Sequence, residues 1–168
     1  MQRRALVGEA TMARLMQPLH SAYGALVGRM SGPVIMTGPA DKRAVALTFD
    51  DGPSPAYTRV VLDVLDRHRV PATFFLLGEQ VRRHPQIARD IVDAGHAIGA
   101  HTYSHPVRIR HQPLHFAREI VRTHWLIARA TGTPPRMFRP PRGIYDPLLF
   151  AELWWLMGYV TVMWSVAA

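Results

Sequence analysis

Ala44-Val45-Ala46-Leu47-Thr48-Phe49, followed at once by Asp50-Asp51-Gly52-Pro53, is the stretch that decides the fold. The compact apolar run at 44–49 is typical of a strand buried on both faces. The Gly-Pro pair after the two aspartates favours a turn at the end of that strand. Strands buried on both faces occur mainly where helices cover a parallel sheet, so an α/β fold is expected.

The chain downstream of this strand alternates between predicted helices and strands. Repeated strand–helix units predict parallel strands joined by right-handed crossovers. The predicted strands are 44–49, 72–77, 96–100, 136–139 and 159–164, and the predicted helices are 56–68, 79–83, 86–94, 113–130 and 147–157.

The chain upstream of the first strand has a different character. Residues 1–30 predict one or two weak helices, and the Gly- and Pro-containing run at 31–39 predicts a linker. We therefore expect an N-terminal helical extension with a linker over 1–40 and an α/β domain over 41–168.

No targeting or membrane-spanning segment is visible in the sequence. The basic N-terminus is not followed by an apolar signal-peptide core, because Glu9, Arg14 and Gln17 interrupt it. No stretch approaches the roughly 20 apolar residues of a transmembrane helix. As the sequence stands, it shows no export route, and a cytoplasmic location is expected.

Composition and charge exclude several classes of protein. With 168 residues, 48% of them hydrophobic, the chain can bury a core, which argues against intrinsic disorder. The absence of cysteine excludes disulfide frameworks, thiolate nucleophiles and cysteine-ligated zinc or iron–sulfur sites.

The net charge of +8 is concentrated in residues 105–142, where eight arginines face one glutamate. Such a stretch could meet nucleic acid, anionic lipid or an anionic polymer, but arginines on solvated helix faces explain it more simply.

Polar motifs directly follow three of the predicted strands. They are Asp50-Asp51, the segment from His101 to His105, and Arg139-Pro140-Pro141-Arg142-Gly143. Because active sites of α/β proteins gather where strands end, these motifs are expected to converge on one site.

Two histidines of one motif have the spacing of a metal site. His101 and His105 are four residues apart and could converge on one metal ion if the segment forms a helical turn. His111 and His115 have the same spacing without following a strand, so position, and not spacing, favours the first pair. Together with Asp51, His101 and His105 form a His₂Asp set with an open position, which suits zinc, cobalt or nickel. Such a metal lowers the pKa of bound water and polarises a carbonyl oxygen.

The remaining polar residues fit a hydrolytic role around that metal. Asp50 could take a proton from water, and Arg139 could pair with Asp50 and hold it ionised and oriented. A tight turn at Gly143 suggests an exposed backbone N–H that could stabilise an oxyanion. The alternative is that Asp-Gly-Pro serves only as a turn with a helix cap.

Residues 43 to 164 resemble the polysaccharide deacetylases, also called the NodB homology domain or carbohydrate esterase family 4. The matching stretches are Thr-Phe-Asp-Asp-Gly-Pro-Ser at 48–54, Ala-Thr-Phe-Phe-Leu-Leu-Gly at 72–78, Ala-Gly-His-Ala-Ile-Gly at 94–99, His-Thr-Tyr-Ser-His at 101–105, Phe-Arg-Pro-Pro-Arg-Gly at 138–143 and Met-Trp-Ser at 163–165. The resemblance implies a deformed (β/α) barrel, here incomplete with about five βα units. It also implies removal of acetyl groups from sugars, usually from N-acetylglucosamine polymers.

The resemblance implies a role for each residue at a matching position. Asp50 corresponds to the catalytic base and Arg139 to the arginine that orients it, and Asp51, His101 and His105 correspond to the metal ligands. A divalent metal, zinc first, is the implied cofactor, and a polysaccharide or oligosaccharide is the implied partner.

Further positions are implied to contact the substrate. Arg142 lies where the family often has tyrosine, and its backbone N–H is the expected oxyanion donor. Tyr103, Pro141 and Trp164 are candidate substrate-binding residues, Trp164 because it adjoins the fourth motif, which walls the acetyl pocket.

The sequence also departs from the family pattern near its end. Ala167 stands where the fourth motif would begin with aspartate, and the fifth motif, a Leu-x-His segment whose histidine protonates the leaving group, is absent. We therefore expect a fragment or a truncated product, with a barrel that does not close and a last strand without its neighbour. Because a general acid contributes roughly 10²–10⁴-fold, the chain is expected to be slow or inactive.

Two alternatives remain beside a metal-dependent deacetylase. One is a non-catalytic carbohydrate-binding remnant that keeps the groove. The other is a basic nucleic-acid-binding protein, which is disfavoured because no helix-turn-helix, RNA-binding aromatic motif or zinc finger accompanies the charge. No nucleic-acid partner is therefore expected.

Overall fold

A computed structural model describes residues 32–38, 41–106, 113–144 and 147–166 of the chain. The predicted helices within 1–30 lie outside these residues. The core of the fold is a parallel six-stranded sheet in the order β1-β6-β5-β4-β3-β2. The strands are β1 (Val34–Ile35), β2 (Leu47–Gly52), β3 (Ala72–Leu76), β4 (Ala97–Ala100), β5 (Met137–Phe138) and β6 (Val160–Val162).

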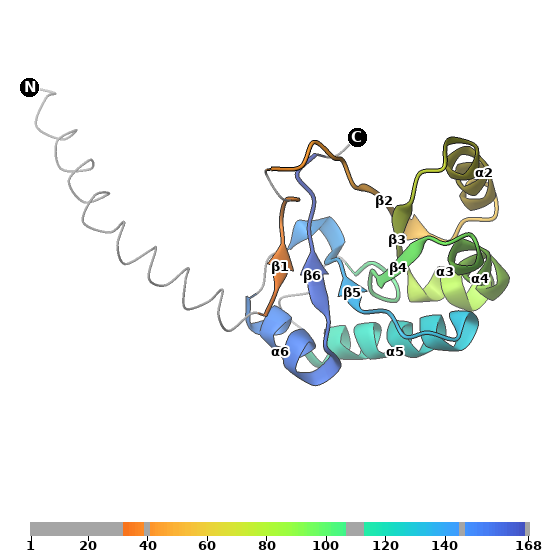
Figure 1. Ribbon diagram of the computed structural model, residues 1–168. Coiled ribbons are helices and arrows are strands. Elements are labelled where there is room, and N and C mark those ends of the chain that lie inside the picture. Colours follow the sequence, from red (N-terminus) through yellow and green to blue (C-terminus); the bar gives the residue numbers. More distant parts are fainter. Residues whose placement is uncertain (1–31, 39–40, 107–112, 145–146, 167–168) are drawn as a thin grey trace, which may run out of the picture.

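The helices connect successive strands and lie along one side of the sheet. They are α2 (Thr58–His68), α3 (Gly78–Arg83), α4 (Pro85–Asp93), α5 (Pro113–Thr131) and α6 (Pro147–Met157), with a short 3-10 helix η1 (Pro141–Gly143). Because β2 to β6 lie side by side in chain order, right-handed crossovers put every connecting helix on the same side. Figure 1 shows these helices as an arc that runs from α2 through α5 to α6. This winding is that of a (β/α) barrel, and the predicted α/β fold is confirmed.

The segment predicted as a linker at 31–39 contributes a strand, so that prediction was wrong. Val34 is paired in parallel with Thr161 and Ile35 with Val162. The N–H of Met163 donates to the carbonyl of Ile35 over 2.8 Å. The last strand therefore does have a neighbour, contrary to the expectation from the sequence. The strand was missed because two residues between glycines and prolines carry no periodicity of their own.

The apolar faces of the helices and strands meet in one core. In α5, Phe116, Ile120 and Ile127 are buried at helical spacing, as an amphipathic helix against a sheet requires. At Gly99, an added Cβ would come within 2.5 Å of the Phe75 ring, so only glycine allows this close packing. None of the helices in the described part of the chain has the length and apolar character needed to cross a bilayer.

Candidate active site

The three polar motifs meet where the strands end. Asp50 and Asp51 lie at the end of β2, His101 directly follows β4 and Arg139 directly follows β5. Asp51 is the extra residue of a β-bulge, because Asp50 is paired with Phe75 while Gly52 is paired with Leu76. The two neighbouring aspartates consequently turn to different partners.

Asp51, His101 and His105 form a cluster that could hold a metal ion. Oδ1 of Asp51 lies 3.6 Å from Nε2 of His101 and 3.9 Å from Nε2 of His105. One ligand atom from each residue lies within 4.8 Å of the other two. These separations are too long for hydrogen bonds but are near the roughly 3.3–3.6 Å between donors of a tetrahedral zinc site. The donor set and its spacing therefore fit a divalent metal.

His101 is held in the form that a metal ligand needs. Its Nδ1 lies 2.7 Å from the carbonyl oxygen of Arg139, and since a carbonyl only accepts, Nδ1 carries the proton. Burial lowers the pKa of His101, so the imidazole is neutral at pH 7. Its Nε2 lone pair is then free to face Asp51 and His105, as in metal sites whose histidines are oriented by a carbonyl.

Arg139 is the polar centre of the site. The residue is buried, and its Nη1 donates to Oδ1 of Asp50 over 2.7 Å and to Oγ1 of Thr48 over 2.8 Å. Its Nε and Nη2 donate to the carbonyls of Val162 and Met163. The guanidinium also lies 4.0 Å from the centre of the Phe75 ring, a cation–π contact. Each of the three guanidinium nitrogens donates at least one hydrogen bond, so the side chain is fixed and holds Asp50 in one orientation.

The loop after β5 brings Arg142 and Pro141 next to Trp164. Arg142 has a positive φ of 57°, and within the described residues no recorded hydrogen bond uses its backbone N–H. At Gly143, also at positive φ, a Cβ would lie 2.8 Å from the Trp164 indole, so glycine makes room for that ring. Pro141 is buried in this turn, while Trp164 is 36% exposed.

Tyr103 faces a different part of the molecule. Its ring lies under the guanidinium of Arg122 at 3.7 Å from the ring centre and against Gly78 of α3. These contacts put the side chain between α3 and α5, and its role in substrate binding stays a prediction.

Glu119 is a structural part of the site that the sequence analysis did not single out. It is buried, and its Oε2 accepts hydrogen bonds from the N–H groups of Tyr103 and Ser104 and from the Ser104 hydroxyl. The buried Thr102 also contributes, because its hydroxyl accepts from the N–H of His105. The sequence did hold a signal for this role. Glu119 is the one acid of the basic stretch at 105–142 and lies beside the apolar Ile120 on the buried face of α5.

Unusual backbone conformations gather at this site. Of the five non-glycine residues with positive φ in the described chain, four lie at the strand ends: Asp51, Thr102, His105 and Arg142. Such conformations cost about 1–3 kcal/mol each and persist where the surrounding contacts enforce them. Their concentration here marks a site whose geometry the fold holds in place.

Comparisons with known proteins agree with this geometry. The family model for polysaccharide deacetylase matches residues 37–158. A peptidoglycan-N-acetylglucosamine deacetylase of Bacillus cereus is 42% identical over 132 residues, which are 77% of this chain and 47% of that protein. A chitooligosaccharide deacetylase of Bradyrhizobium is 42% identical over 74% of this chain and 57% of its own length.

Solved structures share the fold. A family 4 carbohydrate esterase of Bacillus anthracis, described as a pseudoenzyme, superposes with a TM-score of 0.71 at 31% identity over 79% of this chain and 47% of its own. The chain thus spans about half the length of the curated relatives it matches. On the family match and the identity to these relatives, the chain belongs to the polysaccharide deacetylase family.

Proposed function

We propose that this protein hydrolyses the N-acetyl groups of amino sugars in a polysaccharide or oligosaccharide. The observation that carries the proposal is the juxtaposition of an arginine-held carboxylate, Asp50, with the cluster of Asp51, His101 and His105. The relatives named for peptidoglycan and for chitooligosaccharide share an N-acetylated amino sugar as the reacting group.

Asp50 is proposed as the general base of the reaction. Its Oδ1 is occupied by Arg139, which leaves Oδ2 to accept the proton of the attacking water. The water oxygen adds to the carbonyl carbon of the acetyl group, and the carbon–nitrogen bond then breaks. The proton that Asp50 took up passes to the departing amine. The products are acetate and a free amino sugar.

The other residues are assigned by their positions around this base. The Arg142 N–H is the proposed donor to the oxyanion that develops on the acetyl oxygen. Pro141 and Trp164, beside it, are proposed to contact the acetyl group or the sugar. Tyr103, between α3 and α5, is proposed to contact the sugar chain away from the acetyl group.

Asp51, His101 and His105 would hold a divalent metal, with zinc proposed first. When bound, the metal supplies acidity to a water molecule and polarises the acetyl carbonyl. The neutral, oriented imidazole of His101 supports this assignment, because a protonated histidine cannot bind a metal.

Acetate release from chitooligosaccharides and from peptidoglycan, with added zinc or cobalt, tests the proposal. Release that disappears with a chelator and in Asp50→Asn supports it. An aryl acetate, whose leaving group departs without a proton, should be cleaved faster than the N-acetyl substrate if protonation of the amine limits the rate. Acetate release that survives both chelation and Asp51→Ala would overturn the metal assignment.

A second candidate is a carbohydrate-binding protein without turnover. The likeness to a carbohydrate esterase described as a pseudoenzyme supports keeping it. Metal-dependent glycan binding with no acetate from any substrate, the aryl acetate included, would favour this candidate over the hydrolase.

A further inference from the structure

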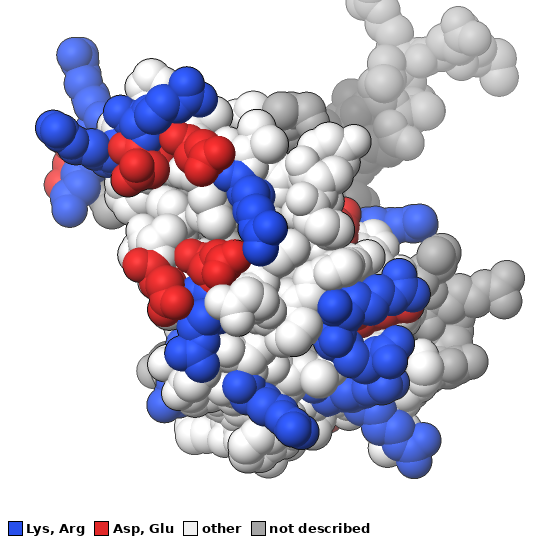
Figure 2. Space-filling view, turned by 90° about the vertical axis from the view of Figure 1, so that its right-hand side faces the viewer, with Lys and Arg blue, Asp and Glu red and all other residues white. Residues whose placement is uncertain are grey.

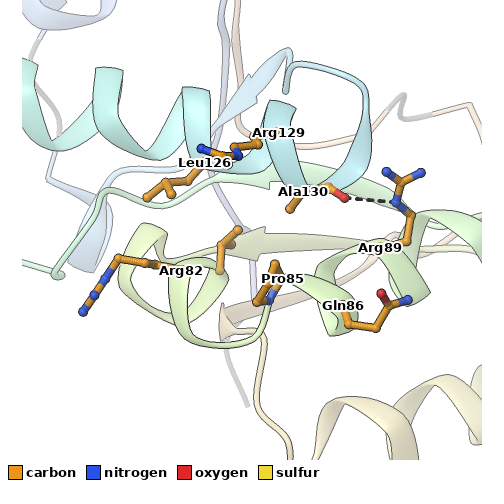
Figure 3. Close-up of a pocket in the computed structure, with 8 residues that line it drawn as sticks. Arg82, Pro85, Gln86, Arg89, Leu126, Arg129 and Ala130 are labelled. Atoms are coloured by element: carbon orange, nitrogen blue, oxygen red, sulfur yellow. Dashed lines mark hydrogen bonds between the residues drawn. The ribbon is translucent and has the colours of Figure 1, made fainter.

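A groove lies on the outer side of the molecule, between α3 and α4 on one side and α5 on the other. Its volume is about 480 Å³, and it is lined by Val81, Arg82, Pro85, Gln86, Arg89, Leu126, Arg129 and Ala130. Figure 3 shows Arg82 on the α3 side, Arg129 on the α5 side, and Arg89 farther along the groove. We call this feature the basic groove. Its lining contains three arginines and neither an acidic nor an aromatic residue.

Within the part of the chain that the structure describes, the cations of the basic groove have no carboxylate partner. Among the described residues, no recorded hydrogen bond or ion pair involves the guanidinium of Arg82 or Arg129, whereas Arg83 and Arg59 have carboxylate partners. Arg89 donates from Nε to the carbonyl of Ala130, a neutral acceptor that leaves its charge unpaired. The nearest acid along α4, Asp90, is engaged by Gln86 and Arg59.

The positive charge continues from the basic groove along α5 toward the active site. Arg118, Arg122 and Arg129 are exposed on this helix, and its one acid, Glu119, is buried beneath the His101–His105 loop. At 1.5 Å per residue, Arg118 to Arg129 span about 16 Å of helix. Figure 2 shows the side of the molecule with α2, α3 and α4, where basic side chains predominate in the lower half.

We propose that the basic groove is a binding site for the carboxylates of an anionic glycan polymer, separate from the catalytic centre. This proposal rests on the proposed function, because it assumes that the same polymer carries the acetylated sugar. Guanidinium groups bind carboxylates in a bidentate manner, and three of them around an apolar floor match an acidic side group on a flexible chain. The line of arginines on α5 would then guide the same polymer toward the strand ends.

The shape and lining of the groove favour a polymer over other anions. Proteins that bind single-stranded nucleic acid stack the bases on aromatic side chains, and the lining has none. A bilayer surface needs protruding apolar side chains, but within the lining Val81 is buried and Leu126 is half-buried; the exposed Trp125 of α5 lies outside the lining. A recessed apolar floor with a cationic rim suits a chain that enters it.

Co-sedimentation of the full chain with insoluble peptidoglycan, whose peptides carry free carboxylates, tests the site. The double variant Arg82→Gln/Arg129→Gln should bind at least about tenfold more weakly, and binding by the unaltered protein should fall as salt is raised. Arg67→Gln, which removes an exposed arginine of α2 whose Nε donates to the carbonyl of Asp63, should bind as the unaltered protein does. Peptidoglycan with amidated carboxylates, and neutral chitin, should show no such dependence on the two arginines.

The controls separate this inference from the proposed function. Acetate release from a short neutral chitooligosaccharide should be equal in the double variant and the unaltered protein, since that substrate has no carboxylate. If no acetate appears but binding still depends on the arginines, the proposed function fails while the groove assignment stands. Unchanged binding of the double variant, or equal binding to amidated peptidoglycan, overturns the assignment. Arginine-dependent binding to phosphatidylglycerol vesicles or DNA, without binding to peptidoglycan, also overturns it.

Discussion

Arg139 and Asp50 are 89 residues apart in the sequence, yet Nη1 of the arginine donates to Oδ1 of the aspartate over 2.7 Å. Their strands, β5 and β2, are separated in the sheet by β4 and β3. The same guanidinium donates to carbonyl groups at the end of β6. One side chain thus joins strand ends from both sides of the curved sheet, and the geometry of the candidate active site depends on it.

Replacing Arg139 by lysine should damage both the fold and the site. Lysine keeps the charge but cannot donate to four acceptors in one plane, so Asp50 and two carbonyls lose their partners. We expect the free energy of unfolding to fall by about 2–4 kcal/mol, and acetate release to fall roughly 10- to 100-fold. Urea unfolding and an acetate assay measure the two effects. Arg83→Lys, at an exposed pair, is the control and should change stability by less than about 0.5 kcal/mol. Equal unfolding curves for the two variants would contradict this reading.

Asp51→Asn should weaken metal binding without weakening the fold. The Asp51 side chain is 61% exposed, and asparagine tolerates the positive φ of this position as well as aspartate does. Loss of the anionic ligand should raise the Kd for zinc by about tenfold or more, as titration calorimetry would measure. His68→Gln is the control, because it removes an exposed imidazole at the end of α2, away from the strand ends. A similar loss of zinc affinity in both variants would refute the assignment of the site.

The order of strands and helices was predictable because each depends on local patterns of apolar residues. His101 directly follows β4, as the sequence predicted, whereas His115 lies on α5 and His111 falls outside the described residues. What the sequence did not reveal depends on contacts between distant segments. The two-residue strand β1 exists only through its pairing with β6, more than 120 residues later. His101 is oriented by the backbone carbonyl of Arg139, and a sequence motif does not indicate where a backbone carbonyl lies.

Glu119 should act on metal binding through the loop that it holds. Glu119→Ala removes the acceptor of two backbone N–H groups and one hydroxyl, which frees the segment between His101 and His105. We expect the Kd for zinc to rise about 10- to 100-fold, as for other residues that orient metal ligands. Glu119→Gln keeps one acceptor oxygen of the same reach and should recover much of the affinity. If Glu119→Ala binds zinc as tightly as the unaltered protein, the residue has no positioning role.

The stability of the metal-free protein should fall as the pH drops below 6.5, in part because of His124. Burial, together with the nearby Arg136, lowers the pKa of His124 below its ordinary value of 6.5. As the pH falls, His124 therefore takes up a proton in the unfolded chain at a higher pH than in the folded protein. The free energy of unfolding is thus highest above pH 6.5 and declines as the pH falls through the lowered pKa. The neutral ring also lies 3.0 Å from the Tyr159 hydroxyl, a contact that favours the unprotonated form if the hydroxyl donates.

His124→Gln isolates this contribution. Urea unfolding at several values between about pH 7.5 and about pH 5 should give a flatter dependence on pH for the variant than for the unaltered protein. Some dependence should remain, because the pKa of His101 is lowered by burial in the same direction. Val60→Gln, at an exposed position of α2 without a titratable group, serves as the control and should keep the slope of the unaltered protein. An unchanged slope in His124→Gln would show that this imidazole titrates alike in the folded and unfolded chain, and the burial argument for it would then be wrong.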